Sequence, residues 1–328
     1  MQGVRSIAAA LAAALMVVAV PAHAQDKYPS KPIRVLNPYA PGGAVDIVAR
    51  IVLEPMRQIL GQPLILENKP GGFGIIAGQD LVNAAPDGYT LWFGNVNTHA
   101  VWPVVHKSKY PFDYAKMIVP VAPVADVPAF LAVTTRDFAP NSLKEAIEYA
   151  RANPGKVRYS SIGVGSFPHF DMALIARRAG VEMTHVPSKG GAGMAQDIAT
   201  GDAHMGFVNV ASSAPMVRSG KLRVFAVVNK ERLPDFPDVP TLGELGYADT
   251  ATHHWLGIFA RAGTPEPILA TLQKAANEAV RRPATIELLK KQAMSPFLMD
   301  SPQAAREWLK GELNRWENKV SELNIKVE

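Results

Sequence analysis

Residues 33–46 read IRVLNPYAPGGAVD, a short apolar strand that ends in a glycine-rich turn and opens into a helix. We expect the strand over Ile33–Asn37 and the helix over Ala44–Leu60, because apolar residues recur there at strand and helix spacing. The same order of strand, turn and helix returns along most of the chain. This repeated alternation predicts an α/β fold with mostly parallel sheets and helices on both faces.

Three further segments take the same position after an expected strand and before an expected helix. They are residues 94–99 (GNVNTH), 163–169 (GVGSFPH) and 186–193 (VPSKGGAG). The carboxyl ends of parallel strands line the crevice of an open sheet, so these turns should face one cleft. A helix start exposes unpaired N–H groups and partial positive charge, and glycine lets a ligand approach them. The four turns therefore predict a site in which backbone amides hold a small anion such as a carboxylate.

A boundary between two lobes is expected at residues 119–134, which read VPVAPVADVPAFLAVT. The stretch is apolar, and its three prolines disfavour a helix. We expect an extended crossing there into a second α/β lobe, with a return near residues 247–255. The prediction is one lobe made of residues 25–127 and 250–328 and a second made of residues 128–249, closing over a cleft. A length of 328 residues fits two domains.

The first 24 residues have the features of a secretory signal peptide. Arg5 is their only charged residue, residues 7–20 are apolar, and Ala22-His23-Ala24 resembles a cleavage signal before Gln25. The apolar run is shorter than the roughly 20 residues that cross a bilayer. We therefore expect cleavage before Gln25 and an exported mature protein.

Composition excludes several other classes of protein. The charge is +5, but the basic residues are scattered rather than gathered with aromatics, so we expect no nucleic-acid partner. Cysteine is absent and the eight histidines form no metal-ligand spacing, so neither a metal nor a disulfide is expected. Residues 72–77 match G-x-G-x-x-A, but Pro70 separates them from their strand, and no phosphate-binding loop of P-loop type occurs. No cofactor is expected.

Ser166 and His169 are the residues that an exported hydrolase would use. Pro168 stands where the G-x-S-x-G elbow needs its last glycine, so the elbow is absent. We expect Ser166 to cap the following helix through its accepting oxygen. His169 should be neutral in the first helical turn, either packed under the loop or in contact with a ligand. The prediction is a protein without enzymatic activity, with a secreted hydrolase as an alternative.

In order along the chain, these segments resemble the Bug family, the TctC-type periplasmic solute-binding proteins of tripartite tricarboxylate transporters. The resemblance is carried by residues 28–33 (YPSKPI), 41–46 (PGGAVD), 67–71 (ENKPG), 85–90 (APDGYT), 220–223 (GKLR), 237–241 (PDVPT) and 262–265 (AGTP), together with the turns above. It implies a two-lobed type II periplasmic-binding-protein fold. It also implies a protein that captures a small organic acid and delivers it to the permease subunits of a membrane transporter. We expect a monomer. A sensor accessory that reports ligand occupancy to a membrane receptor remains open.

The resemblance also implies a set of ligand contacts. In the first lobe they are Tyr39, Ala40, Gly42, Gly43, Ala44, Asn97 and Thr98. In the second lobe they are Gly165, Ser166, Gly190, Gly191 and Ala192. We add Phe167, Phe207 and His254 as apolar or aromatic wall of the same cleft, and we count His169 and Val208 among the ligand-binding candidates.

This chain departs from the family pattern at three positions. Ser188 and Gly193 replace a tyrosine and a proline, and Val208 stands where the family usually has an acid. Valine cannot pair with an ammonium group, so we expect a ligand without one. The hypothesis disfavours amino acids and leaves both aliphatic and aromatic carboxylates open.

Overall fold

The computed structural model describes residues 28–188, 190–229, 231–248, 250 and 252–323. The expected signal peptide lies outside these ranges. Within them, no helix combines the length and the apolar character needed to cross a membrane.

The first sheet has six strands in the order β11-β4-β10-β3-β1-β2. Their bounds are β1 (Ile33–Asn37), β2 (Leu64–Asn68), β3 (Thr90–Asn95), β4 (Ile118–Asp126), β10 (Trp255–Arg261) and β11 (Ser295–Pro296). The second sheet has five strands in the order β7-β6-β8-β5-β9. Their bounds are β5 (Ala129–Thr134), β6 (Val157–Ser161), β7 (Met183–Pro187), β8 (Met205–Asn209) and β9 (Leu222–Val228).

The expectation of mostly parallel sheets is correct for the direction of most strands but not for every pair. Strands β1, β2 and β3 pair in parallel, as do β6, β7 and β8. Strand β10 enters antiparallel between β3 and β4, and β5 enters antiparallel between β8 and β9. The short strand β11 also pairs antiparallel with β4. The chain reaches both β5 and β10 directly from the other sheet, without the crossover connection that joins parallel strands. Each of them can therefore pair antiparallel with its neighbours.

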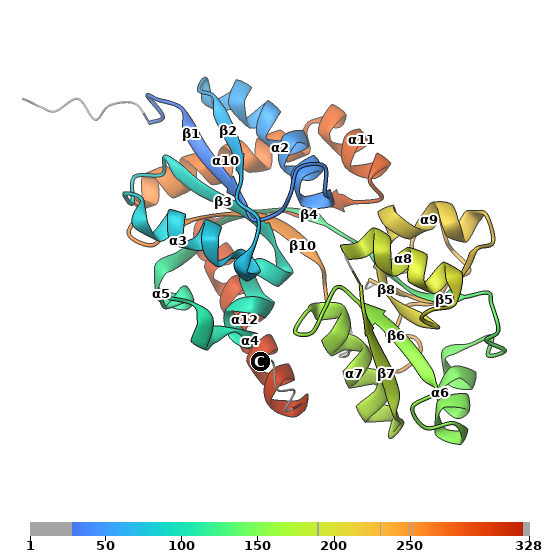
Figure 1. The fold of residues 1–328 in the computed structure, drawn as a ribbon. Helices are drawn as coiled ribbons and strands as arrows, with labels where there is room; N and C mark the ends of the chain where they lie inside the picture. Colours follow the sequence, from blue (N-terminus) through green and yellow to red (C-terminus); the bar gives the residue numbers. More distant parts are fainter. Residues whose placement is uncertain (1–27, 189, 230, 249, 251, 324–328) are drawn as a thin grey trace, which may run out of the picture.

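Helices cover both faces of each sheet, as the alternation predicts (Figure 1). Around the first sheet they are α2 (Ala44–Leu60), α3 (Ile75–Asn83), α4 (Trp102–Val105), α5 (Tyr114–Met117), α10 (Glu266–Arg281), α11 (Pro283–Lys291) and α12 (Pro302–Leu323). Around the second they are α6 (Leu143–Ala152), α7 (Phe167–Ala179), α8 (Gly190–Thr200) and α9 (Val210–Arg218). The described residues also form three short helical turns: η1 (Gly72–Gly74), η2 (Asn97–Val101) and η3 (Lys107–Lys109).

Alternating side chains of each strand fill different cores. In β1, Ile33 and Val35 pack with α2 and α10, whereas Leu36 belongs to the cluster on the opposite face. In β5, Leu131 packs with α6 and α7, and Phe130 packs with α8 and α9. This period of two is what a strand buried on both faces requires.

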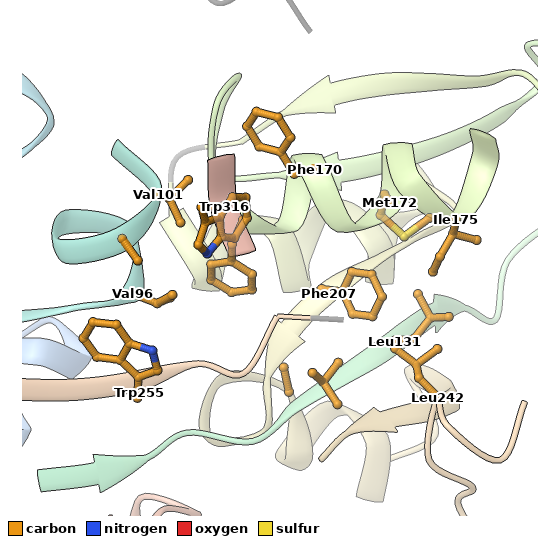
Figure 2. Close-up of a cluster of buried hydrophobic side chains, with 14 of the residues drawn as sticks. Val96, Val101, Leu131, Phe170, Met172, Ile175, Phe207, Leu242, Trp255 and Trp316 are labelled. Carbon is orange, nitrogen blue, oxygen red and sulfur yellow. The ribbon is translucent and has the colours of Figure 1, made fainter. Parts of the chain in front are cut away.

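One hydrophobic cluster continues from the first sheet into the second. It includes Trp255 of β10, Trp316 of α12, Phe170 of α7 and Phe207 of β8, all fully or almost fully buried. Figure 2 shows Phe170 next to Trp316, with Trp255 and Phe207 in the same cluster. The rings of Phe170 and Trp316 meet edge to face, with centroids 5.5 Å apart. Helix α12 therefore joins the two sheets, although the chain positions of these residues are far apart.

A buried ion pair accompanies this contact. Lys319 of α12 donates from Nζ to Oδ1 of Asp171 in α7 at 2.9 Å, and both side chains are almost inaccessible to water. Thr252 donates to the same carboxylate through its backbone N–H at 2.8 Å and its hydroxyl at 2.6 Å. Burial raises the pKa of Asp171, and the lysine and threonine oppose that effect. The carboxylate thus ties together α7, α12 and the strand-like passage that leads into β10.

Candidate functional site

A cavity of about 250 Å³ lies between the two sheets, at the carboxyl ends of β3 and β8 and at the starts of α2, α7 and α8. Several expected site residues line it: Tyr39, Gly43, Ala44, Asn97, Phe167, Gly190, Gly191, Val208 and His254. The turns that the sequence places after separate strands are therefore brought to one point. Other expected site residues are not among those that line it: Ala40, Gly42, Thr98, Gly165, Ser166, His169 and Ala192.

The loop between β1 and α2 is folded around the carboxylate of Asp46, in the first turn of α2. Its Oδ2 accepts from the Gly42 amide at 3.1 Å and from Nε of Arg50 at 3.0 Å. Its Oδ1 accepts from Nδ2 of Asn68 at 3.0 Å, and the same amide group donates to the Tyr39 carbonyl at 2.9 Å. The Gly42 amide is thus already engaged inside the protein. The next residue, Gly43, is the N-cap of α2 and has no side chain to pair with the first amides of the helix. Gly43 and Ala44 line the cavity, so the helix starts at its edge.

Asn95, at the end of β3, organises the second turn. Its Oδ1 accepts from the Tyr39 hydroxyl at 2.8 Å and from the Asn97 amide at 3.1 Å. Thr98 is fully buried and exchanges hydrogen bonds with the Asn95 backbone, donating to its carbonyl and accepting from its N–H, each at 3.0 Å. Thr98 therefore holds the turn from behind instead of lining the cavity.

The loop at residues 163–166 is held by groups beneath it. The Ser166 hydroxyl donates to the Gly163 carbonyl at 2.7 Å and makes no capping bond to α7, so the expected acceptor role of Ser166 is wrong. The reason is local, because Gly163 adopts a positive φ that turns its carbonyl toward that hydroxyl. His169 accepts from the Gly165 amide through Nδ1 at 3.4 Å and packs against His185, with ring centroids 4.4 Å apart.

His169 is neutral, as expected, but burial is the main cause. Burial and the neighbouring His185 lower the pKa of His169 to about 4. The side chain of His169 packs under the loop, which is one of the two positions that the sequence allowed for it. In the described structure, Ser166 and His169 do not form the hydrogen-bonded pair that a serine hydrolase needs.

Two hydrogen bonds cross the cavity from one sheet to the other. Oδ1 of Asn97, which follows β3, accepts from the Phe167 amide at the start of α7 at 3.2 Å. Nδ1 of His254, which precedes β10, lies 3.0 Å from Oδ1 of Asn209, the last residue of β8. Burial, with a smaller contribution from His253, lowers the pKa of His254 to about 4, so its ring is neutral at pH 7.

The remaining wall is apolar and uncharged. Val208 is 1% exposed and Phe207 is equally buried, and Met194 and Met294 add flexible side chains from α8 and the segment before β11. None of the described residues that line the cavity carries a formal charge at pH 7. No group of three or more acidic or histidine side chains in the described ranges is arranged to hold a metal ion.

Sequence reasoning missed the two asparagines that end β3 and β8. Asn95 and Asn209 both line the cavity, and Asn37 and Asn68 end β1 and β2 in the same way. A signal was present, since an asparagine ends the strand expected at residues 33–37 and stands one or two residues after the strands expected at 63–67, 90–93 and 204–208. It could have been used together with the rule that strand ends line the crevice.

Comparison with known proteins agrees with this architecture. The profile of the tripartite tricarboxylate transporter family receptor, TctC, matches residues 48–325. The structure of R. palustris Rpa4515 with adipate is similar at a TM-score of 0.79 and 29% identity, over 91% of this chain and 99% of that one. The structure of the periplasmic binding protein BugD is similar at a TM-score of 0.77 and 28% identity, over 92% of this chain and 100% of that one. The structure of MatC from Rhodopseudomonas palustris with bound malate is similar at a TM-score of 0.76 and 30% identity, over 89% of this chain and 100% of that one.

These similarities cover nearly the whole described chain and agree with its two mixed sheets and flanking helices. The fold is that of a periplasmic binding protein. The chain belongs to the TctC family, the receptors of tripartite tricarboxylate transporters.

Proposed function

We propose that this chain is an extracytoplasmic solute-binding protein that captures a small organic acid and delivers it to the permease subunits of a tripartite tricarboxylate-type transporter. The observation that carries the proposal is the cavity between the sheets, where several helix starts meet an uncharged wall. Structures of relatives with adipate and with malate support a carboxylate ligand.

The acid is held by backbone amides in this proposal. Gly43 and Ala44 at the start of α2, and Gly190 and Gly191 at the start of α8, line the cavity from opposite sides. Helix starts supply unpaired N–H groups and partial positive charge, so a carboxylate can bind there without an arginine. Each hydrogen bond to a charged group contributes about 1.5–3 kcal/mol. The other expected contacts, Ala40, Gly42, Thr98, Gly165, Ser166, His169 and Ala192, would act by shaping the loops around these amides.

Binding and closure are coupled in the proposed mechanism. Residues 25–127 with 250–328 form one lobe, and residues 128–249 form the other. A ligand between α2 and α8 contacts both lobes only when they are closed, and this differential affinity shifts the population toward the closed form. The hydrogen bonds from the Phe167 amide to Asn97 and from His254 to Asn209 would form in the same closing movement.

The wall of the cavity restricts the ligand. Val208 and the other lining side chains in the described ranges offer no carboxylate to an ammonium group. A buried cation without a partner is strongly unfavourable, so the proposed ligand is an organic acid without an amino group. The wall of Phe167, Phe207 and Met194 accepts either an aliphatic or an aromatic body.

Export and assembly complete the proposal. Residues 1–24 would be removed before Gln25 and the mature chain would act in the periplasm as a monomer, without a cofactor and without chemical change of its ligand. Intact-mass measurement of the protein from the periplasm tests the cleavage position. A chain that begins at Met1 would contradict it.

A thermal-shift screen of organic acids, followed by calorimetric titration, tests the function. A ligand at 100 times its dissociation constant should stabilise the protein by about 2.7 kcal/mol. The bound acid should be recovered unchanged, and Ser166→Ala should still bind it. Failure of every acid to bind, or release of a chemically altered product, would refute the proposal.

A further inference from the structure

His254 carries a buried ring nitrogen that has no hydrogen-bond partner in the described structure. The side chain lines the cavity, is 6% exposed and packs against Phe167 with ring centroids 4.9 Å apart. Its Nδ1 faces Oδ1 of Asn209, whereas Nε2 is buried without a hydrogen-bond partner. A buried nitrogen without a partner is unfavourable, so such an atom calls for a group that the protein itself does not supply.

The partner of Nδ1 determines what Nε2 can do. The side-chain oxygen of Asn209 only accepts, so Nδ1 of His254 must carry the hydrogen. In a neutral imidazole the other nitrogen then holds a lone pair and accepts. Nε2 therefore requires a hydrogen-bond donor.

Few ligand groups can meet that requirement. A carboxylate only accepts, so it cannot pair with the lone pair of Nε2. An ammonium group donates, but none of the described lining residues carries a carboxylate to balance its charge. An alcoholic or phenolic hydroxyl donates and is uncharged, so it satisfies Nε2 without leaving a buried charge.

We propose that His254 is a specificity-determining residue that selects hydroxylated organic acids, by accepting a hydrogen bond from the ligand hydroxyl at Nε2. The inference rests on the proposed function, because it assigns one group of the acid held by the helix starts. His254 precedes β10 of the first sheet and Asn209 ends β8 of the second. A hydroxyl bound at Nε2 polarises the ring and strengthens the hydrogen bond from Nδ1 to Asn209. The imidazole of His254 therefore takes part both in ligand selection and in the contact between the two sheets.

Calorimetric titration of matched acids tests this selection. The probes are malate with succinate, lactate with propionate, and 3-hydroxybenzoate with benzoate, in which the members differ by one hydroxyl. In the wild type, the hydroxylated member of a pair that binds should bind about tenfold more tightly. In His254→Phe, which keeps a ring against Phe167, the preference should fall to within about twofold. The fall should come from weaker binding of the hydroxylated acid.

His253→Phe is the matched control. His253 is the neighbouring histidine, contacts Asp126 at 2.6 Å and is not a lining residue of the cavity, so this variant should keep the full preference. A second measurement needs no variant: in ¹⁵N spectra of the wild type, Nε2 of His254 should appear unprotonated and shift only with the hydroxylated acid.

The outcomes separate the two proposals. Acids that bind with no hydroxyl preference, or a preference that survives in His254→Phe, would overturn the role of His254 alone. Absence of binding for these probes and for every acid of the wider screen would overturn the proposed function and this inference with it. An Nε2 that stays unchanged when a hydroxylated acid binds would also contradict the assignment.

Discussion

Replacing Asp46 with asparagine removes the carboxylate around which the first loop of the cavity is folded. The side chain is 3% exposed and receives hydrogen bonds from Arg50, Asn68 and the Gly42 amide. Burial raises the pKa of Asp46, but these hydrogen bonds outweigh burial and lower it to about 2. The folded protein therefore prefers the ionised carboxylate more strongly than the unfolded chain does.

The size of the effect follows from that pKa. A carboxyl group whose pKa falls from 3.8 to about 2 on folding stabilises the protein by about 2.5 kcal/mol at pH 7. Because the folded-state value is the lower one, the contribution is complete above about pH 5 and disappears as the pH falls through 4 toward 2. About half of it should remain at pH 3.

Urea unfolding followed by tryptophan fluorescence measures this contribution. Asp46→Asn should lower the free energy of unfolding by about 2–2.5 kcal/mol at pH 7 and by about half as much at pH 3. Glu54→Gln is the control on the same helix, since Glu54 pairs with Arg57 at an exposed position, and it should cause no measurable change. An Asp46→Asn variant as stable as the wild type at pH 7, or a deficit of equal size at both pH values, would refute the reasoning.

Four further substitutions test other parts of the structure. Asp171→Ala leaves the Lys319 ammonium buried without its counter-charge, so we expect the free energy of unfolding in urea to fall by about 3–5 kcal/mol. The double variant Asp171→Leu with Lys319→Met should recover most of this loss. An Asp171→Ala protein as stable as the wild type would contradict this prediction. Gly43→Val should keep the melting temperature, because φ at Gly43 is −73° and an added Cβ meets only ordinary contacts, yet it should weaken acid binding in titrations. Unchanged affinity would remove Gly43 from the site. Gly42→Ala, at a φ of 80°, should instead destabilise by about 1–2 kcal/mol. Val208→Asp should weaken acid binding by like-charge repulsion and also lower stability, since the position is buried; normal binding would place Val208 outside the ligand's reach.

The fold was predictable where the pattern is local. Strand β1 and helix α2 have the bounds expected from residues 33–60, because apolar spacing and a glycine after Leu60 define them. The direction of β5 and β10 was not predictable in the same way. Each pairs with strands far away in the sequence, and only the path of the chain between the two sheets decides how it enters.

The site was predictable in its backbone and less so in its side chains. Glycines after strands indicated the helix starts that now line the cavity, including Gly43 and Gly191. Ser166 was misjudged because its partner is the carbonyl of Gly163, whose direction depends on one positive φ. The contact between Asn209 and His254 connects the two sheets and involves residues 45 positions apart in the sequence, so no local spacing predicts it.

The burial of Lys319 against Asp171 has a consequence for the order of folding. Helix α12 follows α7 along the chain, and Lys319 is synthesised 148 residues after Asp171. Until α12 arrives, α7 carries a carboxylate that cannot be buried without its counter-charge. Final packing of α7 therefore depends on a lysine that lies far along the chain, in α12.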